Sequence, residues 1–192
     1  MDTTDLTWTP INRTVLYQGK IFTLVNSTHT RTQGAPTDFH LLESPDWVNV
    51  IAITPNAQGV PCFVLVRQFR PGAQTTALEF PGGLVDSGEG SETAAQRELL
   101  EETGYRSHSM VLIGQTNPNP AFMTNRMYTY FTDQVTGGFD LNLDHNEVLE
   151  PVLVPVEAIL SGSVPEFFVN GIMLIALGWY RMHLEAQKGT RE

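Results

Sequence analysis

The sequence has little of the features that mark several classes of protein. It contains a single cysteine in 192 residues, Cys62, so no intramolecular disulfide can form. Cys62 lies in the apolar run 60–66, where we expect it to act as a small core side chain. Basic residues number 11 against 21 acidic ones and form no run, giving a formal net charge of -10. This balance argues against nucleic acid as a partner.

Long hydrophobic runs are also missing. The most apolar segment, 172–177, is flanked by Gly171 and Gly178 and is far shorter than the roughly 20 residues that span a bilayer. Residues 1–5 contain neither the basic nor the apolar region of a signal peptide. We therefore expect a cytoplasmic protein without a membrane partner. Hydrophobic residues make up 41% of the chain, which excludes a disordered composition.

The pattern of apolar residues predicts an α+β fold. Short alternating runs between about 12 and 42 indicate a small N-terminal antiparallel sheet, and we assign residues 1–45 to this region and 46–192 to the main domain. Strands before and between a few helices favour a sandwich over a doubly wound sheet. The predicted strands are 48–54, 60–67, 76–80, 110–114, 126–132 and 148–154, and the predicted helices are 91–103, 156–160 and 169–187.

The helix 91–103 carries the clearest chemistry. Ser91 is its expected N-cap, and Gly104 is expected to close it in the left-handed conformation. At 100° per residue, Glu98, Glu101 and Glu102 share an arc of about 100° on the helical wheel. Like charges at this spacing destabilise a helix unless a cation lies against them.

Arg97 precedes Glu101 by four residues and can offset one of these charges, which leaves Glu98 and Glu102 pointing the same way. Oxygen ligands of this kind suit Mg²⁺ or Mn²⁺ rather than zinc. The alternative is an ordinary solvated acidic face.

The spacing around this helix extends to a longer pattern, G-x5-E-x7-R-E-L-x-E-E-x-G. It resembles the signature of the Nudix hydrolases, read at Gly83, Glu89, Arg97, Glu98, Leu99, Glu101, Glu102 and Gly104. The resemblance implies an α/β/α sandwich with a mixed sheet. It also implies Mg²⁺-dependent hydrolysis of a nucleoside diphosphate linked to another group.

The same resemblance implies roles for individual residues. Glu98 and Glu102 are the expected principal metal ligands, and Glu89, Glu101 and the carbonyl of Gly82 are expected to contribute. Arg97 is expected to hold Glu89 or Glu101 in position, in support of catalysis. The general base is open between an acid of the signature, such as Glu101, and Glu147 in the loop 144–147, for which a solvated loop acid is the alternative.

Further matches look like the ADP-ribose pyrophosphatase branch. They are Val66-Arg67-Gln68-Phe69-Arg70, Glu79-Phe80-Pro81-Gly82-Gly83 and Pro120, 15 residues beyond Tyr105. The branch implies cleavage of ADP-ribose to AMP and ribose 5-phosphate by a homodimer built in part by the N-terminal strands. Other substrates, such as a GDP-sugar or a dinucleoside polyphosphate, and a noncatalytic nucleotide-sugar sensor are the alternatives.

Candidate substrate contacts are few. Arg67 and Arg70 are three residues apart, so in a regular strand they point to opposite faces and one of them is expected to meet a phosphate or the terminal ribose. Surface roles are the alternative for both. Glu79 and Pro120 belong to the same matched segments. Phe122 is a candidate to stack on a base, with core packing as the alternative.

Overall fold

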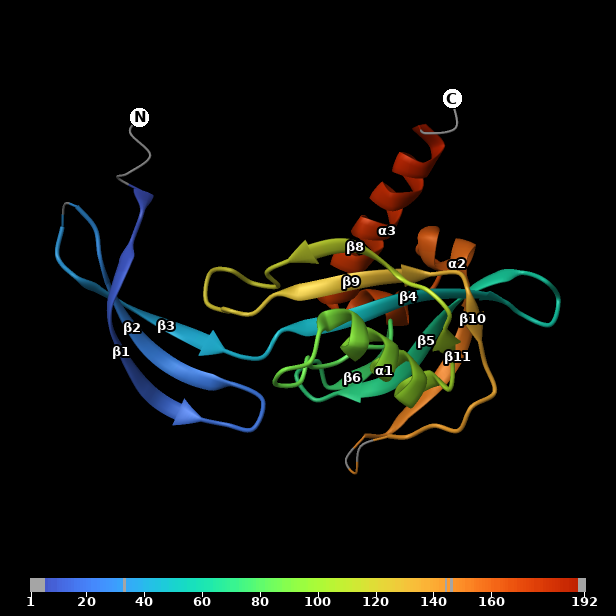
Figure 1. Cartoon of the computed structure of the whole chain (residues 1–192), viewed down its shortest axis with the longest axis horizontal. Helices are drawn as coiled ribbons and strands as arrows, with labels where there is room; N and C mark the ends of the chain where they lie inside the picture. Colours follow the sequence, from blue (N-terminus) through green and yellow to red (C-terminus); the bar gives the residue numbers. More distant parts are fainter. Residues whose placement is uncertain (1–5, 33, 144, 146, 190–192) are drawn as a thin grey trace. The chain divides into compact units, whose positions relative to one another are not determined.

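The computed structural model describes residues 6–32, 34–143, 145 and 147–189 (Figure 1). Asp144 and Asn146 of the predicted acidic loop therefore lie outside the described residues. The chain divides into two compact units. The first comprises the chain up to Asp46 together with Asn117–Arg126, and the second comprises Trp47–Thr116 and Met127–Glu192. The segment 117–126, predicted to belong to the main domain, folds with the N-terminal strands.

The first unit is a three-stranded antiparallel sheet in the order β1-β2-β3, formed by β1 (Thr9–Gln18), β2 (Thr23–Thr30) and β3 (Thr37–Glu43). Segment 117–126 attaches to β3, where the Leu42 N–H donates to the Phe122 carbonyl at 2.7 Å and the Thr124 N–H donates to the Leu42 carbonyl at 3.1 Å. Every residue of β1 is exposed, whereas Val25 of β2 is fully buried.

The second unit is built on a mixed sheet in the order β11-β5-β4-β9-β8, with β6 paired to β5. The pairing of β4 with β9 is parallel and the other pairings are antiparallel. The strands are β4 (Trp47–Pro55), β5 (Pro61–Arg70), β6 (Thr75–Glu79), β8 (Val111–Thr116), β9 (Met127–Thr132) and β11 (Leu149–Pro155).

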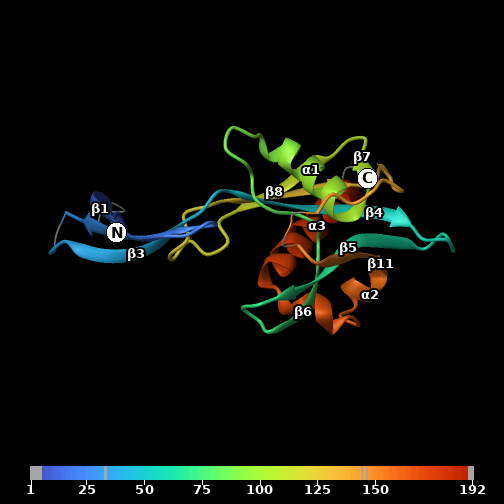
Figure 2. The ribbon, with the colours of Figure 1, turned by 90° about the horizontal axis from the view of Figure 1, so that it is seen from below.

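Helices cover both faces of this sheet (Figure 2). Because side chains alternate along β4, Val48 and Val50 face α1 (Ser91–Thr103) and pack on Leu99. Ile51 faces α3 (Gly171–Gly189), α2 (Val156–Leu160) and the 3-10 turn η2 (Pro165–Val169) on the other side. The layers confirm the predicted α+β sandwich with a mixed sheet. Cys62 is fully buried.

Several local expectations were inexact. The short strands β7 (Arg106–Ser107) and β10 (Val135–Thr136) and the turn η2 were not predicted, because two to five residues carry too little periodicity. Ser91 is not the N-cap of α1: Gly90 takes that position, and the Ser91 hydroxyl lies 2.8 Å from that of Tyr130. Gly104 does close α1, with φ 67° and its N–H donating to Leu100. Within the described chain, the structure contains no helix with the length and apolarity needed to span a membrane.

Candidate active site

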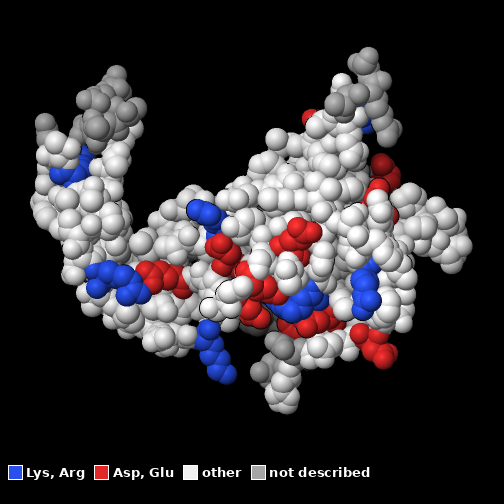
Figure 3. All heavy atoms as spheres, viewed as in Figure 1, with Lys and Arg blue, Asp and Glu red and all other residues white. Residues whose placement is uncertain are grey.

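Helix α1 positions the acidic side chains at the edge of its packed face. Leu99 is fully buried against the sheet, and the neighbouring Glu98 and Glu102 are 8% and 3% exposed. Both carboxylates are therefore largely removed from water. The helical wheel alone does not show this burial. Figure 3 shows acidic side chains gathered over this part of the molecule, with basic ones among them.

The loop after β6 runs along β4 and brings its backbone to these carboxylates. The Val50 N–H donates to the Pro81 carbonyl and the Val48 N–H to the Gly83 carbonyl, each at 2.9 Å. The Gly82 N–H, between these two anchored residues, donates to Glu102 Oε2 at 2.9 Å. The glycine-rich turn is thus pinned to β4 on one side and to α1 on the other.

Gly83 allows the backbone of this loop to lie close to the Glu98 carboxylate. A Cβ atom at this position would lie 2.5 Å from Glu98 Oε1, well inside contact distance. A side chain here would therefore displace the Glu98 carboxylate. This steric limit explains why the signature has a glycine at this position.

Arg97 holds three of the carboxylates. Its guanidinium donates to Glu89 at 3.1 and 3.0 Å, to Glu98 at 2.8 Å and to Glu101 at 3.2 Å. A further hydrogen bond, to the Leu84 carbonyl at 3.0 Å, fixes the arginine to the loop. The sequence predicted contact with Glu89 or Glu101, and the structure places Arg97 against both and against Glu98.

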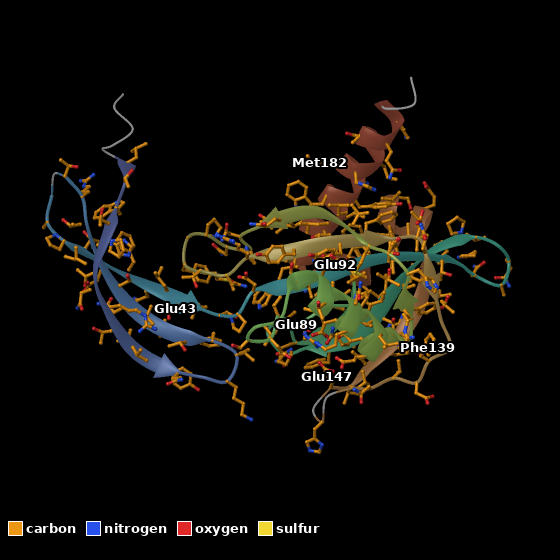
Figure 4. The ribbon with its side chains drawn as sticks, in the orientation of Figure 1. Glu43, Glu89, Glu92, Phe139, Glu147 and Met182 are labelled. Carbon is orange, nitrogen blue, oxygen red and sulfur yellow. The ribbon has the colours of Figure 1, made fainter. Side chains whose placement is uncertain are left out.

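The pKa values of the acids in this cluster are shifted in opposite directions. Hydrogen bonding to Arg97 lowers the pKa of Glu89. Burial raises the pKa of Glu98, and it raises that of Glu102 to about 8 despite the bond from Gly82. The negative charge of the exposed Glu147 side chain makes a smaller contribution in the same direction to the pKa of both Glu98 and Glu102. Glu89 and Glu147, from separate segments of the chain, are labelled in Figure 4.

The donor set fits a hard divalent cation. Three carboxylates, those of Glu89, Glu98 and Glu101, pair with one guanidinium, and the charge of Glu98 also acts on Glu102, so the cluster has more acidic groups than basic ones. Glu98 Oε2 and Glu102 Oε1 accept no hydrogen bond from the described residues, and all the side-chain donors are oxygens, which suits Mg²⁺. No three acidic, histidine or cysteine side chains within the described chain already surround a common point at metal distance. In the structure Nη1 of Arg97 lies between Glu98 and Glu101 and donates to both.

The two arginines of β5 lie on opposite faces, as their spacing predicted. Arg67 bonds to Glu150 at 3.1 Å and to Glu166 of η2 at 2.9 Å. Arg70 donates through its guanidinium fork to Glu79, with one distance of 2.9 Å. Because side chains alternate along β5, Arg70 points to the same face as Val64, which packs with residues of α1, so Arg70 is the arginine on the α1 side.

Glu79 itself is only 2% exposed and has both oxygens engaged. Asn170, immediately before α3, donates to Glu79 Oε1 at 2.9 Å. Sequence reasoning missed Asn170. An asparagine before a helix is a capping signal, but nothing in the sequence pairs it with a carboxylate 91 residues away.

Two predicted substrate contacts lie in the other compact unit. Pro120 and Phe122 belong to segment 117–126, and the Phe122 side chain is 41% exposed, so it does not fill a core. Their contact with substrate stays a prediction. Glu101 is partly exposed and bonds to Arg97, and its role as a base also stays a prediction.

Comparison with known proteins decides the family. Residues 45–169 match the NUDIX domain. The chain belongs to the Nudix family. An ADP-ribose pyrophosphatase of Bacillus subtilis is 26% identical over 147 residues, 76% of this chain and 77% of that protein. The ADP-sugar pyrophosphatase of Mus musculus is 47% identical over 64 residues, which span 33% of this Nudix chain and only 29% of the mouse protein.

A solved structure supports the fold. The crystal structure of an ADP compounds hydrolase superposes with a TM-score of 0.79 at 22% identity, covering 94% of this chain and 96% of the other. At this identity the match shows that the two chains share the Nudix fold. It includes the N-terminal strands as well as the sandwich, since so little of either chain is left uncovered.

Proposed function

We propose that this protein is a Mg²⁺-dependent hydrolase of nucleoside diphosphate sugars, with Mn²⁺ as a possible substitute and with ADP-ribose converted to AMP and ribose 5-phosphate. The observation that carries the proposal is the pair of buried carboxylates, Glu98 and Glu102, set against the glycine-rich loop in a cluster with more acidic groups than basic ones. Buried acids of one charge are unfavourable without a cation, and a pyrophosphate needs the same cation for binding.

In this proposal Glu98 and Glu102 hold the metal, with Glu89, Glu101 and the Gly82 carbonyl as further ligands. The carbonyls of Pro81 and Gly83 already accept hydrogen bonds from β4, so the Gly82 carbonyl between them is assigned to the ion. When bound, Mg²⁺ neutralises the diphosphate and lowers the pKa of a coordinated water. Arg97 holds the acids together and oriented through its hydrogen bonds to Glu89, Glu98 and Glu101.

The remaining residues act on water and phosphate. A carboxylate, Glu147 or Glu101, accepts a proton as a water oxygen bonds to one phosphorus and the bridging P–O bond breaks. Arg70, on the α1 side of β5, is positioned to pair with a phosphate oxygen. The names of the relatives, ADP-ribose and ADP-sugar pyrophosphatases, support an ADP-linked substrate.

The proposal includes a cytoplasmic homodimer. Strand β1 lies at the edge of its sheet, and its exposed apolar residues Ile11, Val15, Leu16 and Tyr17 are 47–59% exposed. An exposed apolar edge strand pairs readily with another chain. Sedimentation of the protein and of a Val15→Lys variant tests this: a parent that sediments as a monomer contradicts the dimer.

A substrate panel tests the activity. ADP-ribose, another ADP-sugar, a GDP-sugar, a dinucleoside polyphosphate and an oxidised nucleotide are each incubated with Mg²⁺ or with EDTA, and the products are separated by chromatography. We expect AMP and ribose 5-phosphate from ADP-ribose in Mg²⁺ and none in EDTA. Preferred turnover of another nucleotide would reassign the substrate. Tight binding of ADP-ribose without any turnover would instead identify a sensor.

A further inference from the structure

Asn170 joins two parts of the second unit, α3 and β6, through its amide. Its Oδ1 accepts a hydrogen bond from the Ile172 N–H at 3.0 Å, in the first turn of α3, and its Nδ2 donates to Glu79 Oε1 at 2.9 Å. The first bond satisfies one of the backbone donors that a helix start leaves open. The second places the end of α3 in direct contact with the buried carboxylate that closes β6.

Glu79 links Asn170 to Arg70. Its Oε1 accepts from both Asn170 and Arg70 Nε, and its Oε2 accepts from the second arm of the Arg70 fork and, at 3.5 Å, from Gln68. With Glu79 only 2% exposed, each of these donors offsets the cost of burying its charge. A carboxylate held on three sides in this way fixes the plane of the guanidinium that it binds.

Arg70 is a partly exposed residue of this hydrogen-bonded network. Its side chain is 43% exposed while its partner Glu79 is buried, so the guanidinium is anchored to a buried carboxylate and is also accessible to solvent. The hydrogen bond to Glu79 and, to a smaller extent, the negative charges of Glu102 and Glu147 raise the pKa of Arg70. Without a firm anchor, Glu102 and Glu147 would draw the cation toward the metal ligands.

We propose that Asn170 is a positioning residue for Arg70: by capping α3 and donating to Glu79 at once, it sets the carboxylate that orients the Arg70 guanidinium toward a bound phosphate. The phosphate contact rests on the function proposed above. The orientation of Arg70 by Asn170 does not, and it can be measured in the free protein.

The residue type matches this double task. Serine or aspartate at position 170 can cap a helix as well as asparagine does. Serine is too short to reach Glu79, and aspartate has no donor and sets a second negative charge against it. Asn170→Ser and Asn170→Asp therefore keep the helix start and remove the link to Glu79. Gly171→Ala is the matched control, since a Cβ at Gly171 meets nothing within 4 Å.

Kinetics with ADP-ribose and Mg²⁺ test the role in binding. We expect Asn170→Ser to raise KM about tenfold with kcat within about twofold of the parent, the pattern of lost substrate binding rather than lost chemistry. Gly171→Ala should leave both constants unchanged. In an Arg70→Ala background, Asn170→Ser should have no further effect, because contacts that act through one another are not additive. An equal tenfold loss in both backgrounds would overturn the proposal.

A second measurement needs no substrate. In ¹⁵N-labelled protein, the Arg70 Nε–H signal, assigned with Arg70→Lys, should exchange slowly with water in the parent and in Gly171→Ala. It should exchange at least about tenfold faster in Asn170→Ser and Asn170→Asp, as it should in Glu79→Gln. Unchanged exchange in the Asn170 variants would overturn the positioning role. Faster exchange in a protein that turns over none of the nucleotides would retain this role and reject the proposed function.

Discussion

The backbone N–H of Gly82 donates to Glu102 Oε2 at 2.9 Å, joining the loop after β6 to a helix residue 20 positions later. This bond compensates part of the cost of burying the carboxylate. It does not compensate all of it, since burial and the charge of Glu98 still raise the pKa of Glu102 to about 8. The ionised Glu102 carboxylate therefore lowers the stability of the metal-free protein. For this reason a substitution of Glu102 can reduce activity without reducing metal-free stability.

Glu102→Gln should lower activity and leave the metal-free fold intact. The amide oxygen can still accept the Gly82 N–H, while the negative charge that binds the cation is gone. We expect kcat/KM in Mg²⁺ to fall by about 100-fold or more, since the metal supplies several kcal/mol of charge stabilisation. In EDTA at pH 9 the variant should melt at the same temperature as the parent or higher.

Glu92→Gln is the control for this experiment, because Glu92 lies in the first turn of the same helix and is exposed (Figure 4). It removes the same charge without touching the cluster and should keep activity within about twofold. If Glu102→Gln retains half of the parent activity, Glu102 is not a metal ligand.

The metal-free protein should lose stability as the pH rises. Glu102 in the folded chain binds its proton up to a pKa of about 8, far above the ordinary glutamate value of 4.5, so between these limits the folded state holds more protons than the unfolded state. Its contribution is fully present below pH 4.5 and is lost as the pH passes through 8. The raised pKa of Glu98 acts in the same direction.

Urea unfolding in EDTA at pH 6 and pH 9 measures this effect. We expect a lower midpoint at pH 9 and a slope with pH that Glu102→Gln reduces. Mg²⁺ should raise the midpoint more at pH 9 than at pH 6, because the ion binds the ionised carboxylates. A metal-free midpoint that rises from pH 6 to pH 9 would show that the Glu102 carboxyl is already ionised at pH 6.

Local patterns predicted most of the second unit and the acids of its site. The strands β4, β5 and β9 are rich enough in apolar, aromatic and β-branched residues, and the acids of α1 regularly enough spaced, to be recognised from short stretches of chain. The contacts that join distant segments were beyond such patterns. The bond from Asn170 to Glu79 spans 91 residues, and the return of segment 117–126 to β3 depends on backbone bonds that any side chain permits.

Burial was the other quantity that the sequence did not reveal. The wheel placed Glu98 and Glu102 on one arc, yet it could not distinguish a solvated acidic face from a buried one. The distinction comes from Leu99 on the same helix and from the loop at Gly83, which together remove both carboxylates from water. That burial turns a common surface composition into a strong candidate metal site.

Arg97→Lys should weaken the cluster even though the charge is kept. A lysine has one ammonium group in place of a planar fork, so it cannot bond Glu89, Glu98, Glu101 and the Leu84 carbonyl together. We expect the free energy of unfolding to fall by about 2 kcal/mol and kcat to fall about tenfold or more. Urea unfolding and steady-state kinetics measure the two effects.

Arg181→Lys provides the comparison for that variant, since Arg181 on α3 donates to the Leu160 carbonyl outside the acidic cluster. Its kinetic constants should match those of the parent. Wild-type kcat in Arg97→Lys would show that the fork is not needed to orient the acids.

Gly83→Ala should reduce activity strongly while changing the stability of the fold little. The added Cβ would lie 2.5 Å from Glu98 Oε1, and this atom is the far end of a flexible side chain, so the carboxylate can move while the backbone stays. A displacement of about 1 Å at a reacting centre can cost about 100-fold in rate, and we expect a loss of 10- to 100-fold in kcat/KM. The melting temperature should stay within about 4 °C of the parent.

Gly90→Ala adds a methyl group whose nearest neighbour is Thr93 Oγ1 at 3.9 Å, and it should keep full activity. Equal activity in the two variants would mean that the position of Glu98 does not limit turnover, and Glu98 would then lose its assignment as a principal ligand.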